Sequence, residues 1–586
     1  MRIKKTGKWV FLPVVLVISL VLNACSKNIT TPAATETYVL PKSSATFTSV
    51  KPVNTNTPQP AVTSTPTLLP STSSEIAANS AGMVVFAMGD GGYHHLFAFH
   101  PNLLPISRLT SGDWDDSDPA VSPDGNWLAF TSNRSGQWDI YIWNLSQNSL
   151  QQVTNTPDFE AGLDWSPDGQ WITYSSSSGG QSDIFIRSVS DSSAAPIQLT
   201  EGAGNNIDPS WSAQGRQIAF STNRNGRYEI WLAQLDNVGN RFTRIAGDDE
   251  ADYLMPTWSP DGTQIAWEKD FENPTIQLMT FKAETQNLSD IAVGKNPFWS
   301  PDGKTLLARL DSPNSYFLTG YEPTTGLLMY PLISLPANTS QLQWGGGDSF
   351  RNLSAILSEQ QKSPEGPLCT PIQSVPTSIT GRISLVPISS VDIENAYLSD
   401  LADECFLSLQ TTLKSTLGWD LLTNLGSAAL AITAAPDPGI PQNWLYTGRA
   451  FSLKLSPFEA GWLVVSREDF DGLTYWRIWA KCLNLDGSCG QMISIPVWDF
   501  DSRASGNLQA FESGGQLTSP PLGYWVDVTE VANQFGWKRI PSQSNWRTYY
   551  PGILFNTLVF KQGKSWQQAM AELYPQDVID SVTAGK

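Results

Sequence analysis

Short runs of alternating hydrophobic and polar residues fill the middle of the chain and predict β-strands rather than helices. Runs such as 127–131, 172–174 and 218–221 alternate with a period of two, and turns containing glycine, asparagine or proline separate them. A period of two puts alternate side chains on opposite faces of a strand, whereas a helix needs a period near 3.6. Residues 81–346 are therefore expected to form many short antiparallel strands joined by tight turns.

One five-residue phrase recurs five times in this part of the chain and defines a repeating unit. Four copies read Val/Trp-Ser-Pro-Asp-Gly, and the third reads Trp211-Ser-Ala-Gln-Gly215. Proline, aspartate and glycine favour a tight turn. A repeat of about 40–45 residues with four strands is typical of a β-propeller. The serines are 44, 46, 47 and 41 residues apart, at Ser122, Ser166, Ser212, Ser259 and Ser300.

The two ends of this array predict how the ring closes. Residues 83–110 supply three strands without a preceding copy of the phrase, and residues 341–344 supply one strand after the fifth copy. Joining these pieces completes a sixth blade and removes the free sheet edges of an open array. The sequence therefore predicts a six-bladed all-β propeller over residues 81–346.

The repeated phrase, with the Arg-x-Gly and Asp-Ile-Tyr elements that follow it in the blades, resembles the TolB-type propeller family. The resemblance covers residues 81–346. It implies the propeller fold but no single activity, because the family includes periplasmic partner-binding proteins and the non-catalytic propellers of serine peptidases.

After a connector over residues 347–380 the pattern changes to mixed helical and strand spacing. About 200 residues remain, which is enough for a separate hydrophobic core. The fold prediction is therefore a multidomain chain, with the propeller followed by an α+β domain over residues 381–586. Helices are expected over 391–416, 421–432 and 528–535, and strands over 462–466, 474–479 and 491–497.

Two segments of this domain resemble zinc-dependent D,D-carboxypeptidases of the VanY-like family. Asn443-Trp-Leu-Tyr-Thr-Gly-Arg-Ala-Phe-Ser452 resembles their motif Ser-x-His-x-x-Gly-x-Ala-x-Asp, and Phe535-Gly-Trp-Lys-Arg-Ile-Pro541 resembles the stretch before their last zinc ligand. Leu445 stands at the histidine position and Ser452 at the aspartate position. Catalytic zinc needs three protein ligands, usually including imidazole. We expect the scaffold without a metal, and a chance match in an unrelated domain is the alternative. The degenerate motif comprises Leu445, Gly448, Arg449, Ala450 and Ser452.

Four cysteines, Cys369, Cys405, Cys482 and Cys489, lie in the last third of the chain. In an exported protein an even set indicates disulfides, and three connectivities are possible. We favour Cys482–Cys489, across the turn at 485–487, together with Cys369–Cys405. A zinc site is the alternative, although the spacings fit no Cys-x-x-Cys pattern.

The N-terminus has the pattern of an export signal, because basic residues precede an apolar run over 9–22. The run ends in Leu22-Asn-Ala-Cys25, which resembles a bacterial lipobox. This resemblance implies that residues 1–25 are a lipoprotein signal peptide and that Cys25 becomes acylated, for example with palmitate. More than one acyl chain gives stable membrane attachment. An ordinary secretory signal or an uncleaved anchor is the alternative.

Residues 26–80 are expected to be a disordered tether. Thr, Ser and Pro make up 28 of these 55 residues, which leaves too little apolar surface to fold. The net charge of −19 argues against nucleic acid as a partner, since that needs clustered Lys and Arg.

Acidic residues precede several blades in loops that gather at one mouth of a propeller channel. Carboxylates there can bind a cation or a basic peptide. Solvated loops whose aspartates cap turns are the alternative. The histidines, His94, His95 and His100, are expected to be ordinary blade-edge residues, and we expect no cofactor and no bound metal. The proposed acidic set is Asp115, Asp116, Asp118, Asp158, Glu160, Asp208 and Asp252.

These features favour a non-catalytic bacterial envelope protein that lies outside the cytoplasm and is attached to a membrane through Cys25. Its propeller and C-terminal domain would bind a protein or a cell-wall ligand such as peptidoglycan. One alternative is a cell-wall or glycan hydrolase that uses carboxylates such as Glu468, Asp469 or Asp499. A second alternative is a sensor or scaffold for a small solute. The pentapeptide Gly-x-Ser-x-Gly of many serine hydrolases does not occur in the sequence.

Overall fold

A computed structural model describes residues 82–346 and 368–584, apart from residues 91, 101–102, 192, 203, 271–273, 283–284, 314, 337–338, 435–439, 441 and 494. The expected signal peptide with Cys25, the tether, and residues 347–367 of the connector lie outside the described residues.

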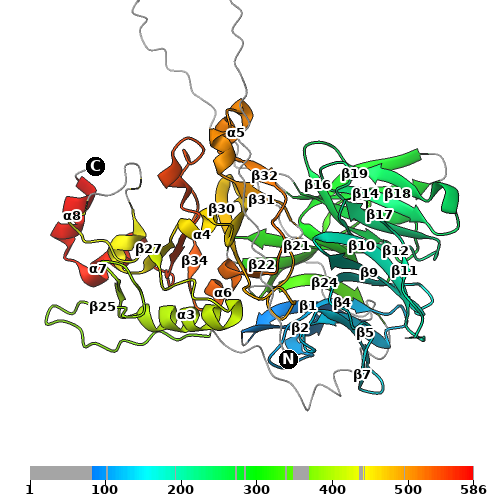
Figure 1. The fold of residues 1–586 in the computed structure, drawn as a ribbon, viewed down its shortest axis with the longest axis horizontal. Coiled ribbons are helices and arrows are strands. Elements are labelled where there is room, and N and C mark those ends of the chain that lie inside the picture. The colour runs from blue at the N-terminus through cyan, green and yellow to red at the C-terminus, as the bar shows by residue number, and fades with distance from the viewer. Residues whose placement is uncertain are drawn as a thin grey trace, which may run out of the picture. The chain divides into compact units, whose positions relative to one another are not determined.

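Residues 83–345 form six four-stranded, propeller-like blades, each an antiparallel sheet (Figure 1). Alternating side chains let each sheet pack against a neighbour on both faces. Ordered from the innermost strand outward, the first two blades are β24 (Thr339–Gly345), β1 (Met83–Asp90), β2 (Tyr93–His100) and β3 (Leu103–Arg108), and then β4 (Asp116–Val121), β5 (Trp127–Ser132), β6 (Asp139–Asn144) and β7 (Ser149–Gln152). The next two are β8 (Phe159–Trp165), β9 (Trp171–Ser178), β10 (Gln181–Ser188) and β11 (Ile197–Gln198), and then β12 (Asn206–Trp211), β13 (Gln217–Thr222), β14 (Glu229–Gln234) and β15 (Phe242–Ala246). The last two are β16 (Asp252–Trp258), β17 (Gln264–Asp270), β18 (Thr275–Lys282) and β19 (Thr285–Val293), and then β20 (Lys295–Trp299), β21 (Leu306–Ser312), β22 (Ser315–Tyr321) and β23 (Leu328–Leu335).

The ring closes because the last strand of the array pairs with the first. β24 lies antiparallel to β1, with Trp344 opposite Val84 and Gly345 opposite Met83. The innermost strands β4, β8, β12, β16, β20 and β24 contact one another in an unbroken circle. The closure predicted from the two ends of the array is confirmed.

Apolar side chains fill the spaces between neighbouring blades. Ile140 of β6 packs in one buried cluster with Trp165 of the next blade. At the closure, Phe86 packs with Phe298 and Trp344. Each blade therefore depends on its neighbours for its core, as expected for a repeat array.

The repeated phrase forms the same backbone turn in all five copies, and in four of them the serine side chain makes the same pair of hydrogen bonds. Ser166 Oγ donates to Asp168 Oδ1 (2.5 Å) and accepts a hydrogen bond from the backbone N–H of Trp171 (2.9 Å). Gly169 has a φ of 66°, which glycine adopts without strain. The repeated phrase thus has a structural role in forming this turn. The same pair of bonds recurs at Ser122, Ser259 and Ser300.

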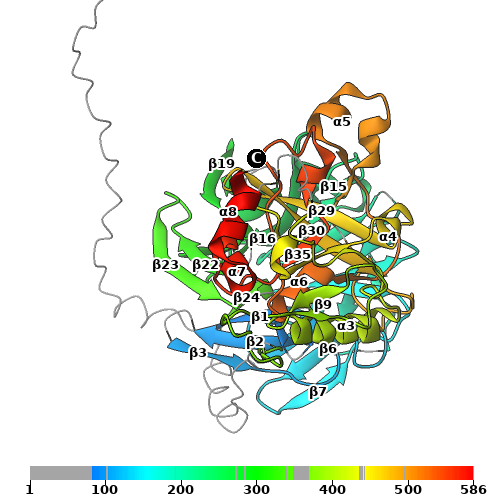
Figure 2. The same ribbon diagram turned by 90° about the vertical axis from the view of Figure 1, so that its left-hand side faces the viewer.

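Residues 368–584 combine short strands with helices beside the propeller (Figures 1 and 2). The longest helix, α3, has acidic residues in its first turn and ends at Gly418 with a left-handed cap, both of which favour a helix. The helices are α3 (Asp403–Leu417), α4 (Ser456–Glu459), α5 (Leu508–Ser513), α6 (Val528–Gln534), α7 (Trp566–Leu573) and α8 (Gln576–Ala584). The strands are β25 (Leu385–Pro387), β26 (Tyr397–Ser399), β27 (Leu425–Ser427), β28 (Ala450–Leu453), β29 (Leu463–Phe470), β30 (Leu473–Lys481), β31 (Val497–Asp499), β32 (Gln516–Thr518), β33 (Trp525–Asp527), β34 (Lys538–Arg539) and β35 (Thr557–Val559). The 3₁₀ turns, the first of which lies in the propeller, are η1 (Val238–Asn240), η2 (Trp444–Thr447), η3 (Asp501–Ala504) and η4 (Tyr550–Ile553).

Three expectations for this region are corrected. Residues 421–432 form no helix, because β27 pairs there with β28, with Leu425 opposite Leu453. The helix expected over 391–416 begins only at Asp403, since β26 precedes it. The strand expected over 491–497 is reduced to one bridge at Gln491 and to β31. In each case pairing with distant residues outweighs local spacing.

The C-terminal core continues onto the propeller. Trp138 and Phe159 belong to the same buried cluster as Tyr524. The ring centroid of Phe159 lies 5.5 Å from that of Trp138 and 6.0 Å from that of Tyr524. Trp138 Nε1 also donates to the carbonyl of Gly490 (2.7 Å). Packing is therefore continuous between the predicted propeller and the predicted C-terminal domain.

Both favoured disulfides are present, Cys369–Cys405 and Cys482–Cys489. The first attaches the connector at Cys369 to α3, and the second closes the turn next to Gly490. The favoured connectivity is confirmed.

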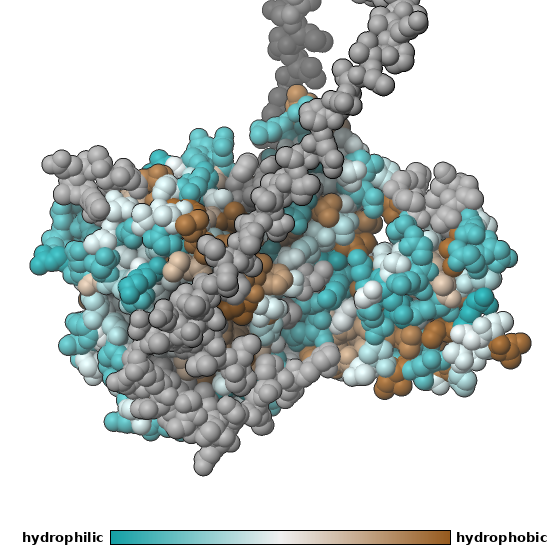
Figure 3. Space-filling model, turned by 180° about the vertical axis from the view of Figure 1, so that it is seen from behind, coloured by the Kyte–Doolittle hydropathy of each residue, from teal (hydrophilic) through white to brown (hydrophobic). Residues whose placement is uncertain are grey.

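Among the described residues, every helix is too short or too polar to cross a bilayer. On the face shown in Figure 3 the hydrophobic areas are interspersed with hydrophilic ones.

Candidate functional site

The innermost strand of each blade contains one residue in the left-handed conformation, next to a shift in strand register. These β-bulges change the direction of the side chains that follow. Proline comes directly after four of the six residues. The six, with φ between 48° and 62°, are Asp118, Gly162, Asp208, Met255, Asn296 and Gln341.

Side chains at these bulges tie neighbouring blades together. Oδ2 of Asp208 accepts a hydrogen bond from the backbone N–H of Met255 (3.4 Å). Oε1 of Gln341 accepts one from the backbone N–H of Asp118 (2.9 Å), which joins the blade that closes the ring to the blade of β4. The bulges thus position polar side chains where the six blades meet.

Three carboxylates, Asp118, Asp164 and Asp208, lie at this meeting point. Burial raises the pKa of Asp118 and of Asp164 to about 6 and that of Asp208 to about 7, and hydrogen bonds from backbone N–H groups offset only part of the effect. Among the described residues, no Lys or Arg contributes to these shifts. The three groups therefore favour a proton or a cationic partner near neutral pH.

A cavity of about 830 Å³, here named the central cavity, lies between the channel mouth and the C-terminal region. Asp118 and Asp208 line its propeller side, and Arg477, Asp527 and Glu530 line its C-terminal side. Its volume falls in the range of about 300–1,000 Å³ that is common for ligand pockets.

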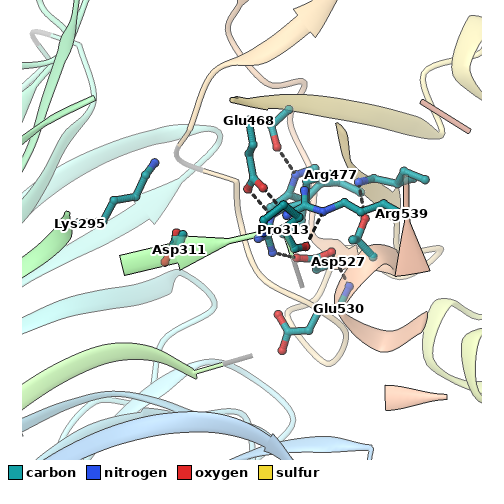
Figure 4. A network of polar contacts seen from close by, with 12 residues as sticks. Lys295, Asp311, Pro313, Glu468, Arg477, Asp527, Glu530 and Arg539 are labelled. Atoms are coloured by element: carbon teal, nitrogen blue, oxygen red, sulfur yellow. Dashed lines mark hydrogen bonds and ion pairs between the residues drawn. The ribbon is translucent and has the colours of Figure 1, made fainter. Parts of the chain in front are cut away.

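Arg477 of β30 is the centre of a buried polar network at the cavity wall (Figure 4). Its Nε donates to Glu468 (2.7 Å), its Nη1 to Asp527 (2.6 Å), and its Nη2 to the hydroxyl of Tyr316 (3.1 Å). Since Tyr316 belongs to β22 of the propeller, this network also joins the two parts of the structure.

Arg539 of β34 also contacts Glu468 and extends the network to the propeller. Its Nη2 lies 2.5 Å from Glu468, and its Nε donates to the carbonyl of Pro313 in the propeller (3.1 Å). Burial by itself raises the pKa of Glu468, but Arg477 and Arg539 outweigh it and hold that pKa well below its usual range. Glu468 therefore stays ionised and cannot act as a general acid near neutral pH.

His94 of β2 bridges the propeller and α6. Its Nε2 lies 2.6 Å from Oε1 of Glu530, and its Nδ1 lies 3.2 Å from Oδ1 of Asp115. Burial by itself lowers the pKa of His94, but the two carboxylates hold it well above its usual value. The expected role as an ordinary blade-edge residue is corrected for His94. His95 is buried, and the side chain of His100 lies outside the described residues.

The seven acidic residues proposed for the channel mouth are not gathered into one ring. Asp115, Asp118 and Asp208 line the central cavity, whereas the other four do not. Asp116 pairs with Arg134 (2.7 Å). Cationic or hydroxyl groups of the blades engage Asp116, Glu160 and Asp252. Glu160 accepts hydrogen bonds from Thr154 and Thr156, Asp158 lies in the turn that precedes β8, and Asp252 pairs with Arg227.

The three carboxylates named for a hydrolase occupy different surroundings. Glu468 belongs to the Arg477 network. Asp469 accepts a hydrogen bond from Thr474 Oγ1 (2.5 Å), and Asp499 accepts one from the backbone N–H of Asp501, where it caps a turn. Of this set only Glu468 lines the central cavity, so the set supplies no acid–base pair there.

The two segments that resemble the carboxypeptidase motif line a second, smaller pocket of about 480 Å³, here named the C-terminal pocket. Leu445 and Ser452 come from the first segment, and Ile540 and Pro541 come from the second. Across the described residues, no group of three His, Cys, Asp or Glu side chains is placed to hold a metal ion.

The middle of the motif does not line this pocket. Gly448 has a φ of 62° and caps η2. Arg449 is fully buried, with its Nε donating to Glu572 (2.8 Å), and Ala450 lies in β28 opposite Val559. The contacts of these three residues therefore indicate a structural role.

Sequence reasoning missed the cationic side of the site, namely Lys295, Arg477 and Arg539, and also Glu530. These residues come from β20, β30, β34 and α6, and no local motif connects them. The bulges, by contrast, had a signal: each of the first five left-handed residues lies four positions before the serine of the repeated phrase.

A closed ring of six blades with a polar cavity at one mouth defines a β-propeller of the kind that serves as a binding platform. The family model described as the TolB beta propeller domain matches residues 106–198 and 151–345. An uncharacterized protein of Agrobacterium fabrum (Atu1656) is 31% identical over 204 residues, which cover 32% of this chain and 67% of that protein. The chain belongs to the TolB-like β-propeller family.

Two other proteins are also matched over part of their length. A protein TolB homolog of Chlorobium luteolum is 28% identical over 33% of this chain and 34% of the relative. The crystal structure of TolB from Acinetobacter baumannii aligns with a TM-score of 0.40 and 17% identity, over 45% of this chain and 67% of that chain. The chain thus spans about a third of the Chlorobium relative.

Proposed function

We propose that this chain is a lipid-anchored bacterial envelope protein that binds a partner, either a protein or a cell-wall ligand, and catalyses no reaction. Membership in the TolB-like family and the export signal support the envelope role. The observation that carries the proposal is the central cavity, where the propeller and the C-terminal region enclose a space of ligand-pocket size.

Charge favours a partner that presents a basic group to this cavity. Asp118 and Asp208 face it from the channel mouth without a Lys or Arg partner among the described residues. An entering ammonium or guanidinium group would stabilise their ionised forms. The carboxylates on the C-terminal side already have cationic partners, which supports binding rather than acid–base chemistry there.

The test compares wild type with the double variant Asp118→Asn, Asp208→Asn in co-sedimentation with isolated cell-wall sacculi and in pull-downs from solubilised envelopes. The exposed Asp236→Asn is the matched control, because among the described residues Asp236 pairs only with the exposed Arg216. We expect wild type and control to retain the partner and the double variant to lose at least about tenfold in affinity. Equal binding by all three, or the release of soluble peptides or sugars, would overturn the proposal.

The lipid anchor has its own test. We expect labelled palmitate to be incorporated into the wild-type chain expressed in bacteria and not into the Cys25→Ala variant, which should be released from the membrane fraction. Equal labelling of both chains would show that Cys25 is not the attachment point.

A further inference from the structure

The C-terminal pocket differs in charge from the rest of this acidic chain. The whole sequence has a net charge of −19, yet no Asp or Glu lines this pocket among the described residues. Its charged lining residue is Lys561, which follows β35. Lys561 is therefore the charge that the described lining of this pocket presents, in contrast to the carboxylates of the central cavity.

Lys561 carries a charge without a counter-ion. No carboxylate lies within ion-pair distance of its ammonium group among the described residues, and Nζ lies over the Trp444 ring, 5.5 Å from the ring centroid. Burial lowers the pKa of Lys561, and the nearby charge of Lys538 lowers it further. A half-buried ammonium beside a second cation favours an anion, because an anion offsets both effects.

The walls of the pocket indicate the rest of the ligand. Leu445, Ile540 and Phe555 provide apolar surface, while Trp444 lies beside the cation. Gln543 and Gln442 add side chains with amide groups to the lining. Such a lining suits a ligand with one anionic end, an apolar body and an amide or other hydrogen-bonding group.

From this geometry we propose that the C-terminal pocket binds an organic carboxylate, with the carboxylate group on Lys561 and an apolar body against Leu445, Ile540 and Phe555. The ligand is either a free organic acid or the carboxyl end of a peptide. This site goes beyond the proposed function and does not depend on a partner at the central cavity.

The experiment titrates the purified full-length chain with three probes by isothermal calorimetry: hexanoate, N-acetyl-alanyl-alanine and the C-terminal amide of the same dipeptide. The variants are Lys561→Met, Lys561→Arg and the matched control Lys454→Met, since Lys454 is an exposed lysine that does not line the pocket. Thermal unfolding of each variant checks that it folds.

We expect one of the two carboxylates to bind wild type, and the better one identifies the source of the group. Lys561→Met should weaken this binding at least about tenfold, while Lys454→Met should leave it unchanged and Lys561→Arg should retain most of it. The neutral dipeptide amide should bind wild type as weakly as N-acetyl-alanyl-alanine binds Lys561→Met. No binding of either carboxylate at millimolar concentration, equal binding of acid and amide, or unchanged binding by a folded Lys561→Met would overturn the proposal. A failure to bind sacculi leaves this result unaffected, because the two tests use different variants and probes.

Discussion

Single residues with unusual backbone angles shape the channel. Asp118, Asp208 and Asn296 adopt the left-handed conformation that Asp and Asn tolerate better than other residues. Met255 and Gln341 adopt it as well, at a cost of about 1–3 kcal/mol each, because the surrounding ring determines their backbone. A bulge at the equivalent position of every blade is therefore a property of the ring and not of one residue type.

The turn of the repeated phrase can be tested at the same scale. Ser166→Ala is expected to lower the free energy of unfolding by about 1–2 kcal/mol, since it leaves Asp168 and the N–H of Trp171 without their bonds. Ser212→Ala should cost less, because Gln214 replaces the aspartate there and its N–H donates to Ser212 Oγ over 3.3 Å. Urea titration followed by tryptophan fluorescence measures both variants. Equal losses would contradict the role assigned to the aspartate.

At the scale of elements, the C-terminal region is attached to the propeller at separate points. β2 meets α6 through His94, β22 meets β30 through Tyr316 and Arg477, and Trp138 meets the turn at Gly490. All three contacts are hydrogen bonds or ion pairs, and the first two involve charged side chains. Their strength therefore depends on pH and salt more than that of the apolar core does.

The His94 contact should respond to pH in a defined direction. Its folded-state pKa lies above the usual value, so its contribution is complete below about pH 6.5 and is lost as the pH rises through the folded-state value. We expect His94→Gln to destabilise the chain by about 1–3 kcal/mol at pH 6, because it leaves the Glu530 carboxylate without its partner.

Thermal unfolding of wild type and His94→Gln between pH 6 and pH 10 measures this contact. The difference between them should shrink towards alkaline pH. The variant Glu530→Gln, alone and combined with His94→Gln, is the control, and the combined loss should be smaller than the sum of the single losses. A difference that stays constant with pH would show that His94 acts by packing alone.

At the scale of the whole molecule, non-covalent pairing of two distant strands closes the ring. β24 and β1 are separated by most of the propeller sequence, and their contact buries Trp344 against Phe86. Elsewhere in the ring, successive blades are covalently continuous. The closure is therefore the seam at which the propeller is expected to open first.

Trp344→Ala tests this seam, with Trp299→Ala as the matched control in a continuous part of the ring. Both truncations are expected to cost about 3–5 kcal/mol, because both tryptophans are buried. In hydrogen exchange, Trp344→Ala should accelerate exchange in both β1 and β24, whereas Trp299→Ala should act mainly within β16 to β23, the two blades whose shared core contains Trp299. The same exchange pattern in both variants would contradict a weak point at the closure.

Most of the propeller could be predicted from sequence, because each blade is a local unit with its own strand period and turn residues. The spacing of Ser122 to Ser300 and the strand at Trp344 were sufficient for the number of blades and their closure. The candidate site could be predicted only in part. Asp118 and Asp208 follow from their place before the repeated phrase, but Lys295, Arg477 and Glu530 come from segments up to 235 positions apart.

The sequence by itself determined the repeated turn, the six blades and the pattern of an exported chain, because short-range alternation and turn chemistry specify them. Only the tertiary structure decided that the C-terminal region lies on the propeller and encloses the central cavity. It also decided which carboxylates face that cavity and which pair with arginines of their own blades. The physical reason is that burial and ion pairing depend on distances between elements, and those distances exist only after the ring has closed and the C-terminal core has packed against it.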